Sequence, residues 1–159
     1  MILVFFIVLN IIVLFLFIMK KKRLHILEIL VYWLIATYLY QNFSALCYMN
    51  FKTLIIPEKI TFELSHFVNR IILFPLLMVT FLHYYLVFNT TFKRILLTGS
   101  FIILLSGLEW LSDYVGVLIH VNWQIWWSPS FWLAALMVLI GVMTFFRKML
   151  QKGGANARM

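Results

Sequence analysis

The chain has 159 residues, of which 65% are hydrophobic and 11% charged, and its mean hydropathy is +1.03. This composition excludes a soluble globular protein and predicts that residues 1–159 form a single membrane domain. The net charge of +8 does not indicate binding to nucleic acid, because the charges gather at the ends of apolar runs and not on a polar face. The only cysteine is Cys47, which excludes an intrachain disulfide and a CxxC motif.

Five apolar runs are long enough to cross a bilayer, since about 20 helical residues span the hydrocarbon core. They cover residues 2–19, 24–49, 66–92, 95–119 and 128–146. The sequence therefore predicts an all-α integral membrane protein with five transmembrane helices.

Most of the basic residues form three clusters at the ends of these runs. The clusters are Lys20–Arg23, Lys93–Arg94 and a basic tail over residues 147–159. Positive charge that flanks spanning helices collects on the cytoplasmic side, so the clusters predict an amino end outside and a carboxyl end inside. They also predict anionic lipid head groups as partners at the inner face. The first run carries no positive charge before Lys20, which is unlike a secretory signal and favours a retained helix.

Local signals refine the boundaries of the runs. Residues 57–65 are too polar to span and predict a short interfacial helix before the third span. Pro75 is expected to kink that span, and Ser128 with Pro129 predicts a helix start. Four tryptophans near this start predict an anchor at the membrane interface, with an aromatic wall of a ligand site as the alternative. They are Trp123, Trp126, Trp127 and Trp132.

The fourth span carries a polar stripe at helical spacing. It consists of Ser106, Glu109, Asp113, Gly116 and His120. A charged side chain costs about 2.5 to 3.5 kcal/mol at the centre of a spanning helix, so such residues are functional candidates. From their heights along the helices, we expect Arg70 to pair with Asp113 and Glu109 to lack a basic partner. Glu28 is expected to form an ion pair with the nearby Lys20–Arg23 cluster.

These residues and other polar side chains at similar height predict a pocket, open to the outside, for a small molecule or a cation. Its predicted residues are Glu109, Asp113, Arg70, His66, Asn69, Gln41, Ser106 and His120. The alternative is that they bond one another and hold the helices together. A metal site from Glu63, His66, Asp113 and His120 is a weaker alternative, and the sequence predicts neither a metal nor a cofactor.

The sequence contains no GxSxG elbow, HExxH zinc helix or Gly-rich phosphate loop, and no catalytic residue is predicted. It therefore favours a non-enzymatic membrane protein: a transporter-like, channel-like or receptor subunit. One alternative is a structural subunit whose polar stripe docks another helix, as part of a homo- or hetero-oligomer. Another is a membrane-embedded enzyme that acts on a lipid.

Three segments give a resemblance to a known family. Phe74-Pro75, Leu108-Glu109-Trp110 and the run from Asn122 to Ser128 resemble a family of short multi-pass membrane proteins common in endospore-forming Bacillota. The likeness covers about the last two-thirds of the chain. It implies a multi-pass architecture in a bacterial plasma membrane, and it transfers no catalytic residues because the family has no assigned activity.

Overall fold

The structure is a computed structural model that describes residues 1–19 and 24–156, with side chains described through residue 150. Most of these residues, about 82%, are helical, which confirms the all-α prediction. The helices are α1 (Ile2–Met19), α2 (Ile26–Ala45), α3 (Ile60–Val68), α4 (Phe74–Val87), α5 (Thr91–Tyr114) and α6 (Trp127–Asn156). Two π-helical turns, η1 (Leu46–Asn50) and η2 (Asn69–Leu73), and two short strands, β1 (Leu54–Ile55) and β2 (Ile119–His120), complete the described elements.

Four helical stretches of the described chain are long and apolar enough to cross a membrane. They are Ile2–Met19, Ile60–Val87, Thr91–Tyr114 and Trp127–Leu150. These correspond to four of the five predicted spans. The predicted span over residues 24–49 contains α2, whose mean hydropathy is lowered by Glu28 and by the polar residues of its last turns. The residues that α2 buries include Tyr32, Ala36 and Tyr40 in the main core, so α2 is a packing centre of the bundle.

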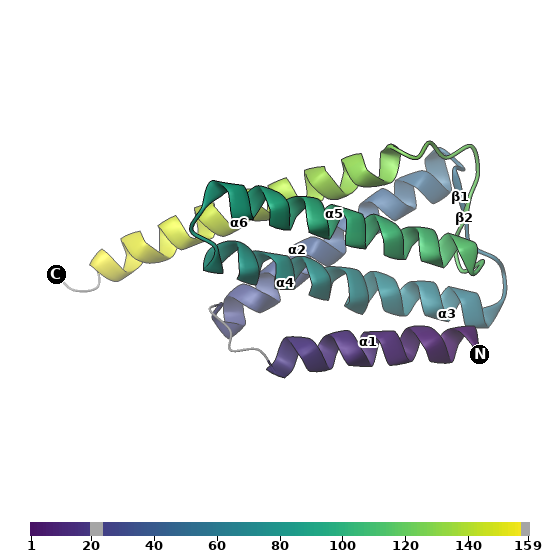
Figure 1. The fold of residues 1–159 in the computed structure, drawn as a ribbon, viewed down its shortest axis with the longest axis horizontal. Helices are drawn as coiled ribbons and strands as arrows, with labels where there is room; N and C mark the ends of the chain where they lie inside the picture. The colour runs from purple at the N-terminus through teal and green to yellow at the C-terminus, as the bar shows by residue number, and fades with distance from the viewer. Residues whose placement is uncertain (20–23, 157–159) are drawn as a thin grey trace.

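The helices alternate in direction along the bundle (Figure 1). The amino terminus, β1 and β2 lie at one end, which we call the strand end. The α4–α5 turn and the carboxyl-terminal part of α6 lie at the other, which we call the basic end, and α6 projects beyond the bundle there. Two of the predicted basic clusters, Lys93–Arg94 and the one that includes Arg147, thus share one end. The third cluster, Lys20–Arg23, lies outside the described residues.

At the basic end, an ion pair joins the start of α2 to α6. Arg147 Nε donates to Glu28 Oε1 at 2.9 Å, and Glu28 is buried while the Arg147 side chain is about one-third exposed. Glu28 Oε2 also accepts from the backbone N–H of His25 at 2.8 Å, which closes a capping box at the helix start. Arg147 is thus an ion-pair partner of Glu28 among the described residues, while the predicted partner, the Lys20–Arg23 cluster, lies outside them. Local sequence patterns do not indicate this contact, because Arg147 lies 119 residues after Glu28.

The predicted interfacial helix is not confirmed as a separate element. Helix α3 begins at Ile60 and continues through η2 into α4, as one helical stretch to Val87. The π-turns of η2 lie directly before Pro75, which has no N–H to give to the carbonyl of Ile71 one α-turn earlier. The indole Nε1 of Trp33 donates to that carbonyl at 2.8 Å. Helix α2 thereby satisfies a backbone group that the proline leaves free.

We expect Arg147→Gln to lower the free energy of unfolding by about 2 kcal/mol, because it removes charged hydrogen bonds from the buried Glu28 carboxylate. Lys148→Gln is the matched control, since Lys148 is an exposed cation next to it. Thermal unfolding in a non-ionic detergent measures both. Equal stability of the two variants would contradict a structural role for the pair.

Candidate functional site

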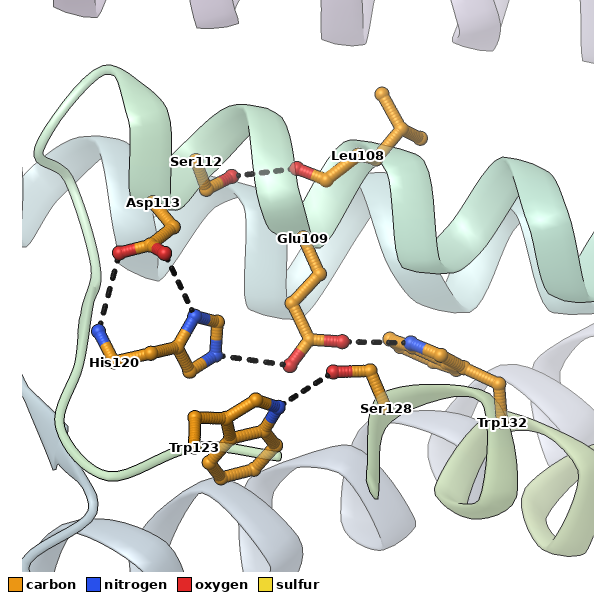
Figure 2. Close-up of polar contacts among 8 residues, drawn as sticks. All are labelled: Leu108, Glu109, Ser112, Asp113, His120, Trp123, Ser128 and Trp132. Atoms are coloured by element: carbon orange, nitrogen blue, oxygen red, sulfur yellow. Dashed lines mark hydrogen bonds and ion pairs between the residues drawn. The ribbon is translucent and has the colours of Figure 1, made fainter. Parts of the chain in front are cut away.

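Glu109 lies in the interior of the bundle and is not without partners. Its side chain is 1% exposed, and Trp132 Nε1 of α6 donates to its Oε2 at 2.8 Å. On the other side, His120 Nε2 of β2 lies 3.5 Å from Glu109 Oε1 (Figure 2). The expectation that Glu109 lacks a basic partner is therefore wrong. The partner is His120, which follows α5 in the chain. Comparing the heights of residues along the spans could not identify it, because it lies outside the spans.

The same histidine contacts a second carboxylate one helical turn away. His120 Nδ1 lies 3.2 Å from Asp113 Oδ2, and the backbone N–H of His120 donates to Asp113 Oδ1 at 3.1 Å. Asp113 thus pairs with His120 and not, as expected, with Arg70. The Asp113 side chain is 37% exposed, against 1% for Glu109. His120 therefore connects a carboxylate that water can reach with one that water cannot.

The fold positions His120 through its backbone. Helix α5 ends in a Schellman motif, in which Gly116 has a φ of +78° and the N–H of Val117 donates to the carbonyl of Ser112 at 2.9 Å. This turn sends the chain back beside β1, where His120 is the register partner of Leu54. The pairing with β1 and the hydrogen bond from the His120 N–H to Asp113 thus hold the imidazole near the last turn of α5.

Tryptophans close the remaining sides of the site. The Trp123 ring centroid lies 4.6 Å from that of His120, and Trp123 Nε1 donates to Ser128 Oγ at 3.0 Å. Helix α6 begins at Trp127, one residue before the predicted start, so Ser128 accepts from Trp123 in place of its expected N-cap role. Trp126 is exposed, as an interfacial anchor would be.

Trp132, which the sequence also assigned to the interfacial anchor, is fully buried. It stacks on Tyr40 of α2 and Phe74 of α4, with centroid distances of 5.2 and 5.1 Å. The donor to Glu109 is therefore part of the core that joins α2, α4 and α6. In the sequence, its position five residues after Trp127 does not distinguish a buried tryptophan from one at the membrane interface.

A pocket of about 340 Å³ gives access to the exposed side of the site. Its lining residues are Trp110, Asp113, His120, Asn122, Trp123 and Ile125. Asp113 and His120 are thus both surface groups of a cavity at the strand end, while Glu109 lies behind them.

The pKa of His120 is raised above its ordinary value. Burial of the ring lowers this pKa, but the contacts with Glu109 and Asp113 raise it by more. Two carboxylates around one imidazole favour the imidazolium.

The other predicted site residues lie elsewhere. His66 and Arg70 line a second pocket, beside α3, with Ser44 of α2. Asn69 accepts from Asn10 Nδ2 of α1 at 3.0 Å, a partner that the sequence analysis did not single out. Gln41 is exposed on α2. Ser106 Oγ is buried and has no hydrogen-bond partner among the described residues.

No group of three or more His, Cys, Asp or Glu side chains within the described residues is arranged to hold a metal ion. The four residues of the weaker metal hypothesis also divide between pockets. Glu63 and His66 line the pocket beside α3, and Asp113 and His120 line the smaller one.

When the chain is compared with protein-family models, curated proteins and solved structures, nothing matches in any of the three. Arguments about function therefore depend on the geometry of the chain itself.

The first prediction for this site concerns pH. Because the pKa of His120 is raised in the folded protein, its stabilising contribution is complete below the ordinary value of 6.5 and is lost as the pH rises through the raised pKa. We expect the thermal midpoint in detergent to fall as the pH rises above 6.5, and to fall less in His120→Asn. Parallel pH profiles for the two proteins would contradict the assignment.

The second prediction concerns the indole of Trp132. Trp132→Phe keeps the aromatic stack but removes the donor to a buried carboxylate, so we expect a loss of about 2 kcal/mol in the free energy of unfolding. Trp126→Phe removes an indole N–H from an exposed tryptophan and should cost much less. Unfolding in detergent compares the two variants, and equal losses would show that the Glu109 contact contributes little.

Proposed function

We propose that the protein is a non-enzymatic, proton-responsive membrane protein: a transporter-like, channel-like or receptor subunit whose responsive group is Glu109. One observation carries this proposal. His120 contacts the exposed carboxylate of Asp113 with one ring nitrogen and the buried carboxylate of Glu109 with the other.

This arrangement suits proton transfer between the pocket and the interior. An imidazole accepts a proton on one nitrogen and releases another from the second. From the imidazolium, the proton on His120 Nε2 would pass to Glu109 Oε1 and leave a neutral imidazole that keeps its Nδ1 proton. After this imidazole changes tautomer, its Nδ1 would accept the next proton from Asp113 and restore the imidazolium.

The charge state of Glu109 would then change the packing of the core. A neutral carboxyl accepts a weaker hydrogen bond from Trp132 than a carboxylate does. Since Trp132 stacks on Tyr40 and Phe74, this bond bears on the contact of α6 with α2 and α4. Protonation at the strand end would thereby shift the packing of three helices, which a transporter-like or receptor subunit requires.

For the membrane arrangement, we propose that α2 is a fifth span and that the strand end faces outward. The packing of one face of α2 in the main core, the exposed leucines on its other face, and the shared end of the Lys93–Arg94 and Arg147 clusters support this topology. Anionic lipid head groups would then contact the basic end. The bacterial plasma membrane remains a proposal that rests on the family resemblance. The alternatives of an oligomer-forming structural subunit and of a lipid-active enzyme stay hypotheses, and the burial of Glu109 against Trp132 of the same chain leaves less of the stripe for an outside helix.

The test follows the protonation of Glu109 by infrared difference spectroscopy on vesicles of uniform orientation. When the pH on the strand-end side is lowered, we expect the carbonyl band of a buried protonated carboxyl to appear, with a change in tryptophan emission. Glu109→Gln should lose the band, and His120→Asn should delay it. Tyr114→Phe, at an exposed position near the end of the same helix, is the control. A band that persists in Glu109→Gln would overturn the proposal.

A further inference from the structure

A second pocket, of about 580 Å³, lies between the carboxyl end of α2 and helix α3, away from the Asp113–His120–Glu109 chain. One face of the α3–η2 helix supplies an ordered set of lining groups. In chain order they are Ile60, Glu63, Leu64, His66, Phe67 and Arg70. Glu58, which precedes the helix, also lines the pocket and is exposed. The pocket therefore has acidic groups at its rim and a guanidinium deeper along the helix.

The deep part of the pocket contains polar groups without partners. Within the part of the chain that the structure describes, no carboxylate forms an ion pair with Arg70, and its buried Nε has no hydrogen-bond partner. His66 is 5% exposed, and its Nε2 also has no partner there. A buried N–H without a partner is costly, and most buried polar groups have a partner. Two such groups at one pocket indicate a ligand that accepts hydrogen bonds and carries negative charge.

Most of the other lining residues of the pocket are apolar, which restricts the class of ligand. Met49 is 69% exposed and Ile60 is 80% exposed beside it. Ile60 begins the helical stretch Ile60–Val87, which is long and apolar enough to cross a membrane. Met49 lies in η1, at the carboxyl end of α2. Such a surface faces lipid more readily than water. The ligand is therefore expected to carry an apolar chain next to its charged group.

We propose that this pocket binds a zwitterionic, amine-bearing membrane phospholipid, with its phosphate at Arg70 and His66 and its ammonium group at Glu63 and Glu58. The spacing agrees with this order of charges. Arg70 follows Glu63 by seven residues, or about 10 Å of helix rise, and helical side chains lean towards the amino end, so the guanidinium approaches the acidic rim. A lipid with net negative charge would satisfy Arg70 but would meet the two carboxylates of the rim.

The site is tested with the full-length protein in a non-ionic detergent, with phosphatidylethanolamine as the probe and phosphatidylglycerol for comparison. Native mass spectrometry counts the retained lipids, and thermal unfolding gives the stabilisation. We expect phosphatidylethanolamine at a hundred times its Kd to raise the thermal midpoint by about 5 °C or more. We expect phosphatidylglycerol to bind about tenfold more weakly, a difference of one charge contact.

Variants separate the parts of the site. Arg70→Gln should weaken phosphatidylethanolamine binding at least tenfold and, since it removes a buried N–H without a partner, should not lower the thermal midpoint of the lipid-free protein. Glu58→Gln with Glu63→Gln should abolish the preference between the two lipids. Lys52→Asn is the matched control, because Lys52 is an exposed cation at the same end whose φ of 51° suits asparagine.

A further variant guards against misfolding of the Arg70 protein. Ala45→Trp fills the apolar part of the pocket, leaves every charge in place and should also block binding. Unchanged retention in both Arg70→Gln and Ala45→Trp would overturn the proposal. Full competition by soluble phosphoethanolamine at the same concentration would overturn the membrane-lipid assignment. His120→Asn should retain the lipid, so failure of the proton-responsive chain would leave this site unaffected.

Discussion

The carboxylate of Glu109 is the constraint on which the strand end of the molecule depends. A charge in the interior of a helical bundle is tolerated only when it is paired and hydrogen-bonded. Here the partners come from two different elements, Trp132 on α6 and His120 on β2. For His120 to reach Glu109, the chain must reverse at Gly116 and pair with β1. The turn after α5 and the two short strands thus hold His120 where it pairs with this buried acid.

Helix α2 shows how packing and membrane insertion place different demands on one segment. It buries Tyr32, Ala36 and Tyr40 against the other helices and supplies the indole of Trp33 to a free carbonyl of η2. Tyrosine, tryptophan and glutamate are suited to these contacts but lower the mean hydropathy of the segment. The other face of α2 is exposed and largely apolar, with Leu27, Leu30 and Leu34 each more than half exposed. A helix can therefore combine a low mean hydropathy with an apolar outer face that suits contact with lipid.

Sequence patterns predicted what depends on composition and local spacing, and missed what depends on loops. Apolar runs gave the all-α class and four stretches that the structure bears out as long and apolar enough to span. Helical spacing brought Glu109 and Asp113 to one face. The estimated heights of residues along the spans suggested Arg70 as the partner of Asp113. Such an estimate treats the helices as parallel rods and takes no account of side chains on the loops. The actual partner, His120, is placed by β-pairing between residues far apart in the chain, which no periodicity reveals. The prediction that Trp132 lies at the membrane interface was also wrong. An indole is common at the interface, but it can equally be buried and donate a hydrogen bond there.

The two pockets are separate in their linings but meet electrostatically at Tyr40. This side chain is 3% exposed, stacks on Trp132, and lies within electrostatic reach of both Glu109 and Arg70. Burial leaves the ring poorly screened from these two charges, which are of opposite sign. The site proposed to take up a proton and the site proposed to bind a phosphate thus share one buried neighbour in the core.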